Sequence, residues 1–445
     1  KTELVNQHRR FGKSLILSTI EAYFEGRKEL FDGLAIAELE KDWNAYPVIH
    51  IDLNTGNYET VDGLLRRINL TLLDQENKHS QPTVESDSGL RFESLIKNIY
   101  KSTGSRVVVL IDEYDKPLLN AIGNPELQEA MRNELRDLYS VLKSCDQYIR
   151  FAMLTGVTKF GRLSVFSGLN NLRDISFRPE YAALCGITEE EMLSNFSEQI
   201  QGMASAEACT MEEMVANLRH MYDGYRFTRA NLLVYNPFSL LNAFDACELG
   251  SYWFETGTPK YLVELLQHND YALSDLDGAT ATVTQLSAFN PDTGEDPIPV
   301  MYQSGYLTIK DYDEKRMRIT LGFPNEEVRT GFMEYVYPFY AKAKNRQKFP
   351  FLSFKDEIED GKAEEFMKRL QALTADMSYE ILANCENDFQ NLMYVIFSLA
   401  STKPVVERHT SNGRIDMLVE TDRFVYIMEY KVDGSAQEAM EQIES

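Results

Sequence analysis

The sequence predicts an α/β protein in three parts: a parallel sheet with helices on both faces, a helical and winged-helix-like middle module, and a C-terminal α/β domain. Two continuous apolar runs, RVVVLID at 106–112 and IRFAMLTG at 149–156, have the length and composition of central parallel strands. Amphipathic helical patterns alternate with such runs over the first part, which is typical of a parallel sheet. We therefore expect domains at residues 1–180, 181–325 and 326–445.

Composition narrows the class of protein. The chain of 445 residues is long enough for two or three domains, and 44% hydrophobic with 26% charged residues is ordinary for a globular protein. A formal net charge of −24 argues against a protein that coats DNA non-specifically, since such proteins carry a basic surface. The charge says little about a nuclease with a small, locally basic site.

The cysteines and the apolar runs indicate the compartment. The five cysteines are scattered without C-x-x-C spacing, so we expect neither a disulfide framework nor a zinc site, but a reducing compartment, the cytoplasm. No apolar run approaches the ~20 residues that span a bilayer. The N-terminus does not resemble a signal peptide, and because it begins with Lys1 we expect the natural start to lie upstream.

Local patterns predict the elements in order. In the first part, helices are expected at 14–24, 61–73, 89–100 and 125–142, and strands at 46–53, 106–112 and 149–156. In the middle module, helices at 188–201, 210–222, 237–246 and 259–266 precede a β-rich stretch. In the last part, helical stretches lead to a segment from Val405 onward that alternates like a β-meander.

The run Gly12-Lys13-Ser14 before the first helix is half of a P-loop, G-x-x-x-x-G-K-[ST]. In a P-loop the backbone amides and the helix N-terminus hold phosphates, the Lys reaches the terminal phosphates, and the Ser hydroxyl binds Mg²⁺. Gln7 stands where the first Gly belongs, and no strand is evident upstream. Alone, the motif is weak, because a solvated helix start explains it too.

The strand RVVVLID leads into Asp112 and Glu113, as a Walker B strand does. One carboxylate there can hold Mg²⁺, and a second can orient the attacking water. Ligands bind at the carboxyl ends of the strands in an open parallel sheet, so these residues and the P-loop half predict one site for ATP and Mg²⁺. The alternative is that Asp112 only caps the following turn. Thr155, which ends the next strand, is either a γ-phosphate sensor in the nucleotide site or a strand-end Thr with satisfied hydrogen bonds.

Six blocks resemble the AAA-ATPase-like family of bacterial proteins, whose members commonly carry a C-terminal PD-(D/E)XK nuclease-like domain. The blocks are RRFGKSLILSTIEAYFEG, LIDEYDKPL, LTGVTKFGRLSVFSGLNNLRDIS, YDGYRF, YNPFSLL and YWFETGTPKYL, between Arg9 and about Leu262. The resemblance implies an AAA-type P-loop sheet. In that family the P-loop also lacks the first Gly but follows a short hydrophobic strand, so we infer that a segment is absent from this sequence near residues 6–8.

The remaining blocks of the resemblance have structural explanations as well. SVFSGLNNLRDIS either lines the nucleotide cleft or forms a hydrogen-bonded loop. YDGYRF and YWFETGTP are aromatic clusters, which we interpret as core or domain-interface packing rather than as base-stacking platforms.

A second candidate site lies in GRIDMLVETDRFVYIMEYK, which contains Asp416, twelve further residues, and then Glu429 and Lys431. Side chains alternate faces along a strand, so Glu429 and Lys431 share a face with Val425 and Ile427. A Glu and a Lys on an otherwise apolar, buried face need partners. Asp416, on the preceding strand, is one candidate.

Two carboxylates and a Lys are what Mg²⁺-dependent phosphodiester hydrolysis needs. The carboxylates hold the metal, and Lys431 orients the nucleophile or stabilises the transition state. Glu407 is a candidate third metal ligand, and Gln442 is a candidate for orienting the substrate or the Lys. The alternative is a surface hairpin with a Glu-Lys pair. The GRID turn and the helix after the pair also resemble PD-(D/E)XK nucleases, which implies that fold and leaves catalytic competence open.

Three functions are compatible with these motifs. The first is an ATP-binding and ATP-hydrolysing P-loop protein coupled to a Mg²⁺-dependent nuclease-like domain that acts on DNA or RNA. The second is an ATP-switched regulatory or interaction protein whose nuclease-like domain binds without cleaving, which the acidic charge and the atypical P-loop favour. The third is a scaffold without nucleotide affinity. We expect no membrane partner, and an oligomer is compatible with the sequence.

Overall fold

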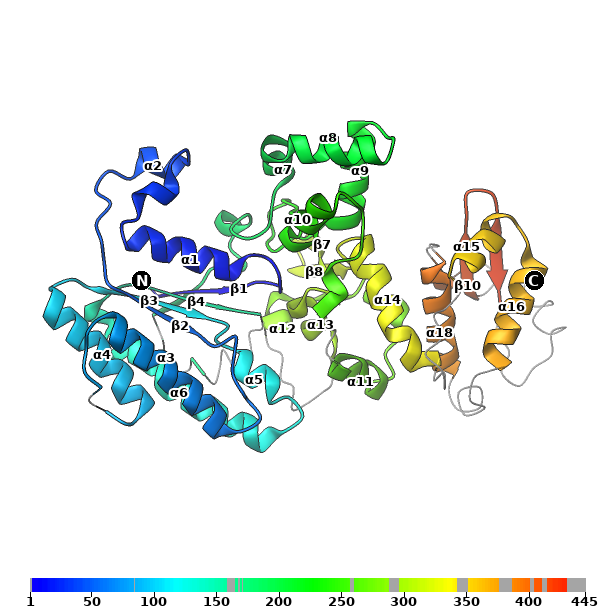
Figure 1. Ribbon diagram of the computed structural model, residues 1–445. Helices are drawn as coiled ribbons and strands as arrows, with labels where there is room; N and C mark the ends of the chain where they lie inside the picture. The colour runs from blue at the N-terminus through cyan, green and yellow to red at the C-terminus, as the bar shows by residue number, and fades with distance from the viewer. Residues whose placement is uncertain are drawn as a thin grey trace. The chain divides into compact units, whose positions relative to one another are not determined.

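The computed structural model, whose elements are labelled in Figure 1, confirms the α/β class. It describes residues 2–83, 85–157, 165–166, 169, 171–256, 260–287, 296–341, 351–375, 386–400, 404–409 and 414–429. The chain divides into two compact units, Lys1–Glu248 with Thr280–Thr320, and Leu249–Ala279 with Leu321–Ser445. The domain boundaries expected near residues 180 and 325 stay predictions.

A five-stranded parallel sheet of order β2-β3-β4-β1-β5 is the centre of the first unit. Its strands are β1 (Thr2–Asn6), β2 (Val48–Asp52), β3 (Val107–Asp112), β4 (Ile149–Gly156) and β5 (Leu172–Asp174). Every residue of β3 is buried, as expected for a strand covered on both faces. The carboxyl ends of β1, β3 and β4 therefore meet at one edge of the sheet.

Strand β1 corrects the expectation that no strand precedes the P-loop. It pairs with β4 over its whole length, from Thr2 opposite Ala152 to Asn6 opposite Gly156, and on its other side with β5. Strand β1 leads through the loop into helix α1 (Lys13–Phe24), as a P-loop requires. The absent segment inferred near residues 6–8 stays a prediction. The strand was missed because it is short and partly polar, and because its two partner strands lie far away in the sequence.

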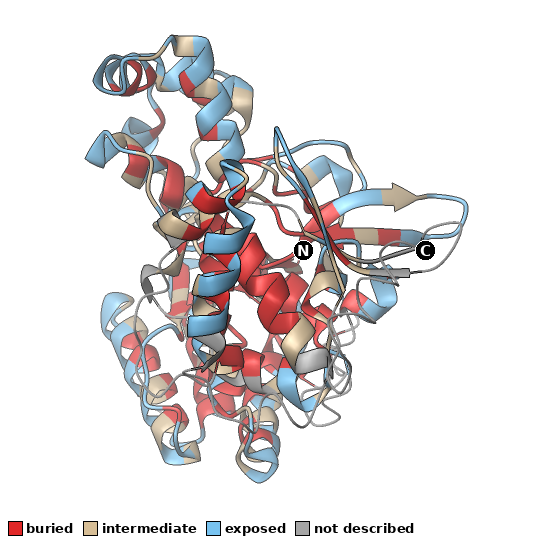
Figure 2. Ribbon diagram, turned by 90° about the vertical axis from the view of Figure 1, so that its right-hand side faces the viewer, coloured by how far each residue is buried: buried red, intermediate tan, exposed pale blue. Residues whose placement is uncertain are grey.

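Helices cover both faces of this sheet (Figure 1). Helix α1 packs on one face, where Leu17 joins a core with Val5 and Val108. On the other face, α3 and α4 contact the sheet and α6 packs against both of them. The helices of this part are α1, α2 (Ala35–Leu39), α3 (Val61–Lys78), α4 (Ser88–Thr103), α5 (Lys116–Asn120) and α6 (Pro125–Ser144). The buried residues of α3, α4 and α6 recur every three or four positions, so each of these helices has a buried side and a more exposed side. Figure 2 colours the whole ribbon by this burial.

The rest of the first unit is mainly helical and ends in a small three-stranded sheet, while the helix expected at 259–266 lies in the second unit, as α11 (Lys260–His268). Its elements are α7 (Glu189–Asn195), α8 (Ser197–Ala206), α9 (Met211–Tyr222), α10 (Pro237–Ala246), β6 (Thr280–Ala281), α12 (Val283–Ser287), α13 (Ile298–Ser304), β7 (Thr308–Asp313) and β8 (Arg318–Gly322). Helices α7 and α9 both begin at capping boxes, at Thr188 and Thr210, where the sequence predicts a helix start. The three strands form a sheet of order β6-β8-β7.

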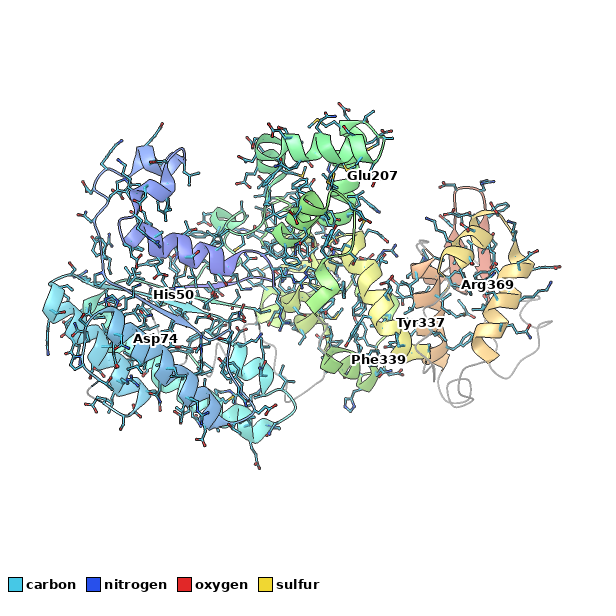
Figure 3. All side chains as sticks on the ribbon, in the orientation of Figure 1. His50, Asp74, Glu207, Tyr337, Phe339 and Arg369 are labelled. Carbon is cyan, nitrogen blue, oxygen red and sulfur yellow. The ribbon has the colours of Figure 1, made fainter. Side chains whose placement is uncertain are left out.

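The second unit confirms the predicted β-meander, an antiparallel sheet of order β11-β10-β9. Its elements are α11 (Lys260–His268), α14 (Glu326–Ala341), α15 (Phe351–Glu359), α16 (Ala363–Ala375), α18 (Glu386–Leu399), β9 (Val405–His409), β10 (Arg414–Glu420) and β11 (Val425–Met428). Arg369 of α16, labelled in Figure 3, pairs with Glu357 of α15 through Nη2 and Oε1 at 2.6 Å. Within the described ranges, each helix is too short or too polar to reach across a bilayer.

A buried ion pair joins α3 to α4 and gives a stability prediction. Nε and Nη2 of Arg91 donate to the two carboxylate oxygens of Glu76, each at 2.7 Å, and this holds the pKa of Glu76 below its usual range. In Glu76→Gln, the guanidinium stays buried without its counter-charge, so we expect a loss of about 3 kcal/mol in the free energy of unfolding at neutral pH.

Because the pKa of Glu76 is lowered on folding, its stabilisation exists above the unfolded pKa of about 4.3 and is lost as the pH falls through the folded value. Urea unfolding of wild type and variant should therefore converge in acid. Glu93→Gln, which breaks an i,i+4 pair with Lys97 on α4, is the control and should cost about 0.5 kcal/mol or less. An equal loss in both variants would contradict the prediction.

Candidate functional site

The segment from β1 to α1 has the geometry of a phosphate-binding loop. The backbone N–H of Gln7, the first loop residue, donates to the carbonyl of Gly156 on β4 at 3.2 Å. Gly12 ends the loop at a φ of 82°, a left-handed conformation that glycine adopts at little cost. Helix α1 starts directly afterwards without a side-chain cap, so its first N–H groups remain available to an anion.

Lys13 is held inside this loop. Its Nζ donates to the carbonyls of Gln7 at 3.1 Å and His8 at 3.0 Å, and it lies 3.8 Å from Oε1 of Glu113. The side chain is buried and makes all three contacts with groups that carry negative or partial negative charge. The ammonium therefore lies inside the loop, where a bound phosphate would take the place of the two carbonyls as its partner.

Three predicted residues meet around one carboxylate. The Oγ of Ser14 donates to Oδ2 of Asp112 at 2.5 Å, and Oγ1 of Thr155 donates to Oδ1 of Asp112, also at 2.5 Å. The N–H of Glu113 adds a third bond to Oδ1 at 3.0 Å. The structure thus brings together the P-loop half and the Walker B strand, which are 98 residues apart in the chain. Thr155 makes the hydrogen bond that a satisfied strand-end Thr would make, so its sensor role stays a prediction.

Glu113, next to Asp112, has an unusual backbone conformation and a raised pKa. It has a φ of 53°, in the left-handed region that is rare for a residue with a side chain. Burial raises its pKa; nearby Asp115 and Asp112 add to the rise, while Lys13 opposes it. A strained, partly desolvated carboxylate 3.8 Å from the P-loop Lys suits a group that accepts or orients a proton.

The second candidate site is partly described. The antiparallel register pairs Met417 with Met428, so Asp416 and Glu429 are the next opposed positions on β10 and beyond β11. The register of β10 with β9 likewise places Glu407 opposite Asp416. Opposed residues of an antiparallel pair face the same side of the sheet, so Asp416 and Glu429 project from one side of it at neighbouring positions. Lys431 and Gln442 lie outside the described residues.

The strand face that carries Glu429 is only partly covered. On β11, Val425 and Ile427 are 61% and 43% exposed, whereas Leu418 of β10, which the register pairs with Ile427, is 4% exposed. The expectation of burial is therefore corrected for β11 alone. On the opposite face, the hydroxyl of Tyr426 donates to the carbonyl of Ile358 on α15 at 2.6 Å. Within the described residues, no group of three or more His, Cys, Asp or Glu side chains is arranged to hold a metal. A metal site here would need groups beyond the described pair.

Two regions of the chain match known protein families. Residues 1–166 match the sequence model of the family described as Predicted AAA-ATPase, and residues 384–445 match that of the PD-(D/E)XK nuclease superfamily. An uncharacterized protein in the vnfD 5′ region of Azotobacter chroococcum mcd 1 is 36% identical over 439 residues, which cover 96% of this chain and 82% of the relative. The chain belongs to the AAA-ATPase-like family with a PD-(D/E)XK nuclease-like domain. The two matches support a nucleotide-binding protein with a nuclease-like part.

The donor groups of the AAA-ATPase-like site fit ATP and Mg²⁺. Ser14 and Asp112 offer oxygen ligands, which Mg²⁺ prefers, and they already lie within hydrogen-bond distance of each other. Gly12 and the start of α1 offer backbone N–H groups, and Lys13 offers a cation. These are the groups that would hold a nucleoside triphosphate and its metal.

Two residues of the AAA-ATPase-like site were missed in the sequence. Asp115 is fully buried, and both of its oxygens accept the N–H of Val157 just beyond β4, at 3.2 and 3.1 Å. Tyr114 donates from its hydroxyl to Oδ1 of Asn6, the last residue of β1, at 3.0 Å. A Cβ at Gly156 would come within 2.6 Å of both residues, so glycine is needed there. The second Asp of DEYD was the available clue in the sequence.

Proposed function

We propose that the chain binds and hydrolyses ATP at the P-loop and that its nucleotide state controls a Mg²⁺-dependent nuclease domain acting on DNA or RNA. The observation that carries the nucleotide half is the hydrogen-bonded set of Ser14, Asp112 and Thr155 beside Lys13 and Glu113. The nuclease half is supported by the family match and by the opposed positions of Asp416 and Glu429.

In the proposed reaction each P-loop residue has one task. Gly12 and the first N–H groups of α1 bind the phosphates, and Lys13 leaves the loop carbonyls to neutralise the terminal phosphates. Ser14 and Asp112 would hold Mg²⁺, which would supply positive charge to the phosphate oxygens. Glu113 orients the attacking water and accepts its proton.

The nuclease-like site has a similar division of tasks in this proposal. Asp416 and Glu429, with Glu407 as a third ligand, would hold Mg²⁺, which lowers the pKa of a bound water. Lys431 would orient that water or stabilise the charge that develops on the phosphate. The described cysteines are free thiols, which suits the reducing cytoplasm that we propose for this protein.

The role of Glu113 gives a pH prediction. A proton acceptor must be ionised, and burial raises the pKa of Glu113. The rate of ATP hydrolysis should therefore fall as the pH drops through a value above about 4.3, the usual pKa of a Glu side chain. Glu113→Gln should lower the rate of phosphate release by about 100-fold or more and remove this acid limb, with ATP affinity nearly unchanged.

Glu134→Gln on α6 is the matched control, since burial also raises the pKa of Glu134 and it is not one of the proposed site residues. It should leave both the rate and the pH profile unchanged. If Glu113→Gln hydrolyses ATP at the wild-type rate, Glu113 is not the proton acceptor.

A binding-only nuclease-like domain is the second candidate function. The net charge of −24 and the exposed Val425 and Ile427 on the Glu429 face favour it, because they suit a protein partner better than a polyanion. Incubation of DNA and RNA in single- and double-stranded forms with Mg²⁺ or Mn²⁺, with and without ATP, decides between the two. Cleavage that needs Lys431 would exclude the binding-only function.

A further inference from the structure

The P-loop is anchored by an aromatic cage that the nucleotide chemistry does not use. The cage consists of Phe11, Tyr225, Phe227 and Tyr302, which surround the ring of His8 at centroid distances of 6.0, 5.7, 5.0 and 5.4 Å. Phe11, from the same loop, also contacts Tyr225 at 4.7 Å. The YDGYRF block supplies two of these rings and α13 supplies one, so the loop is packed on the middle module.

Hydrogen bonding fixes the orientation of His8 in the cage. Its Nδ1 lies 3.2 Å from the carbonyl oxygen of Gln303 in α13, and a carbonyl only accepts, so Nδ1 carries the proton. Burial lowers the pKa of His8 to about 4, so the ring is neutral at neutral pH and Nε2 is an acceptor. The hydroxyl of Tyr225 donates to the carbonyl of Gly305, at the end of the same helix, at 3.2 Å.

The polar atoms around this anchor are unusual for simple core packing. Among the described residues, buried atoms of Asn6, Gln7 and His8 (Nδ2, Oε1 and Nε2) have no hydrogen-bond partner, and the three residues line a cavity of about 20 Å³. A cavity of that size with several polar groups suits one water molecule. A phenyl ring would fill the cage without an unsatisfied nitrogen, so packing alone does not account for an imidazole here.

The backbone of His8 ties this anchor to the phosphate site. Its carbonyl is one of the two that hold Nζ of Lys13. When Lys13 moves to a phosphate, that carbonyl loses its donor while the ring of the same residue remains bonded to Gln303. A movement of the His8 backbone in the loop therefore also moves the His8 ring, which contacts the cage and α13.

We propose that His8 is a positioning residue that fixes the P-loop for ATP and carries nucleotide occupancy to the YDGYRF block and α13. This inference rests on the proposed ATP binding. The group that senses the nucleotide is Lys13, and the segments that respond are 222–228 and 298–306.

The test uses the full chain, with ATP·Mg²⁺ affinity from calorimetry and amide hydrogen exchange of segments 222–228 and 298–306 as readouts. In wild type, ATP should change exchange in both segments several-fold. His8→Phe keeps a ring in the cage but removes the bond to Gln303; it should weaken ATP binding about tenfold and lose the exchange response. His8→Asn can still donate to Gln303 and should retain part of that response.

The matched control is His79→Phe, because His79 also bonds a backbone carbonyl, that of Val48, at 2.9 Å through Nε2. It should leave ATP affinity and the exchange response at wild-type values. If wild type binds ATP and hydrogen exchange changes in neither segment, the inference is wrong while the proposed function stands. This outcome does not depend on whether the variants fold. If His8→Phe binds and responds like wild type, His8 only fills space. If wild type binds no ATP, the proposed function itself fails.

Discussion

Lys13→Ala is expected to weaken ATP·Mg²⁺ binding by about 100-fold or more, because a charge-assisted hydrogen bond contributes roughly 1.5–3 kcal/mol and Nζ can make two of them to phosphates. Nζ already makes two hydrogen bonds within the loop, to the carbonyls of Gln7 and His8, so the ammonium is positioned before the nucleotide arrives. Calorimetry on the full chain measures the effect.

The same substitution should also alter Glu113. Lys13 lies 3.8 Å from its carboxylate and opposes the rise of its pKa that burial causes. Without the ammonium, the pKa of Glu113 should rise further. Any residual hydrolysis by Lys13→Ala should therefore decline at a higher pH than hydrolysis by wild type, which separates the loss of a phosphate ligand from a general loss of structure.

Lys78→Ala is the control for Lys13→Ala. Lys78 forms ion pairs with Glu21 and Glu25 at the far end of α1, each at 2.9 Å. Its removal should leave ATP affinity unchanged, since those pairs are half exposed and distant along the helix from Gly12. Equal affinity in Lys13→Ala and wild type would mean that ATP binds elsewhere, and absence of binding in wild type would leave the P-loop as a scaffold.

The sequence was sufficient to predict the bounds of strands that contain an unbroken run of apolar residues. Strand β4 has the predicted bounds, and β3 differs by one residue, because each contains a continuous apolar run of strand length. The meeting of Ser14 with Asp112 was also predictable, since a P-loop and a Walker B strand end at the same edge of a parallel sheet.

What the sequence could not predict depends on distant partners. Strand β1 is stabilised by β4 and β5, about 150 residues further along, and its own composition is ambiguous. Gln303, the partner of His8, is 295 residues away, so an imidazole in a P-loop gave no hint of a cage. The alternation at Val425 and Ile427 correctly placed them on one face, but alternation does not say how far each strand of that face is covered.

In the nuclease-like part, Asp416→Asn and Glu429→Gln are each expected to lower metal-dependent cleavage by at least about 100-fold, because each amide keeps the shape of the side chain but removes a charge that a divalent metal requires. The two positions are opposed across β10 and β11, one step beyond the last described pair, Met417 and Met428. Cleavage is followed on the DNA or RNA form that wild type degrades fastest, with Mg²⁺ or Mn²⁺ and with a chelator.

Asp422→Asn is the matched control for that pair, since Asp422 is an exposed residue in the turn between the same two strands. Cleavage unchanged in Asp422→Asn and lost in both site variants would locate the nuclease at the opposed carboxylates. Cleavage that survives in Asp416→Asn would place the metal elsewhere. If wild type cleaves nothing yet binds ATP through Lys13, the ATP-switched protein with a binding-only nuclease-like domain is the favoured function.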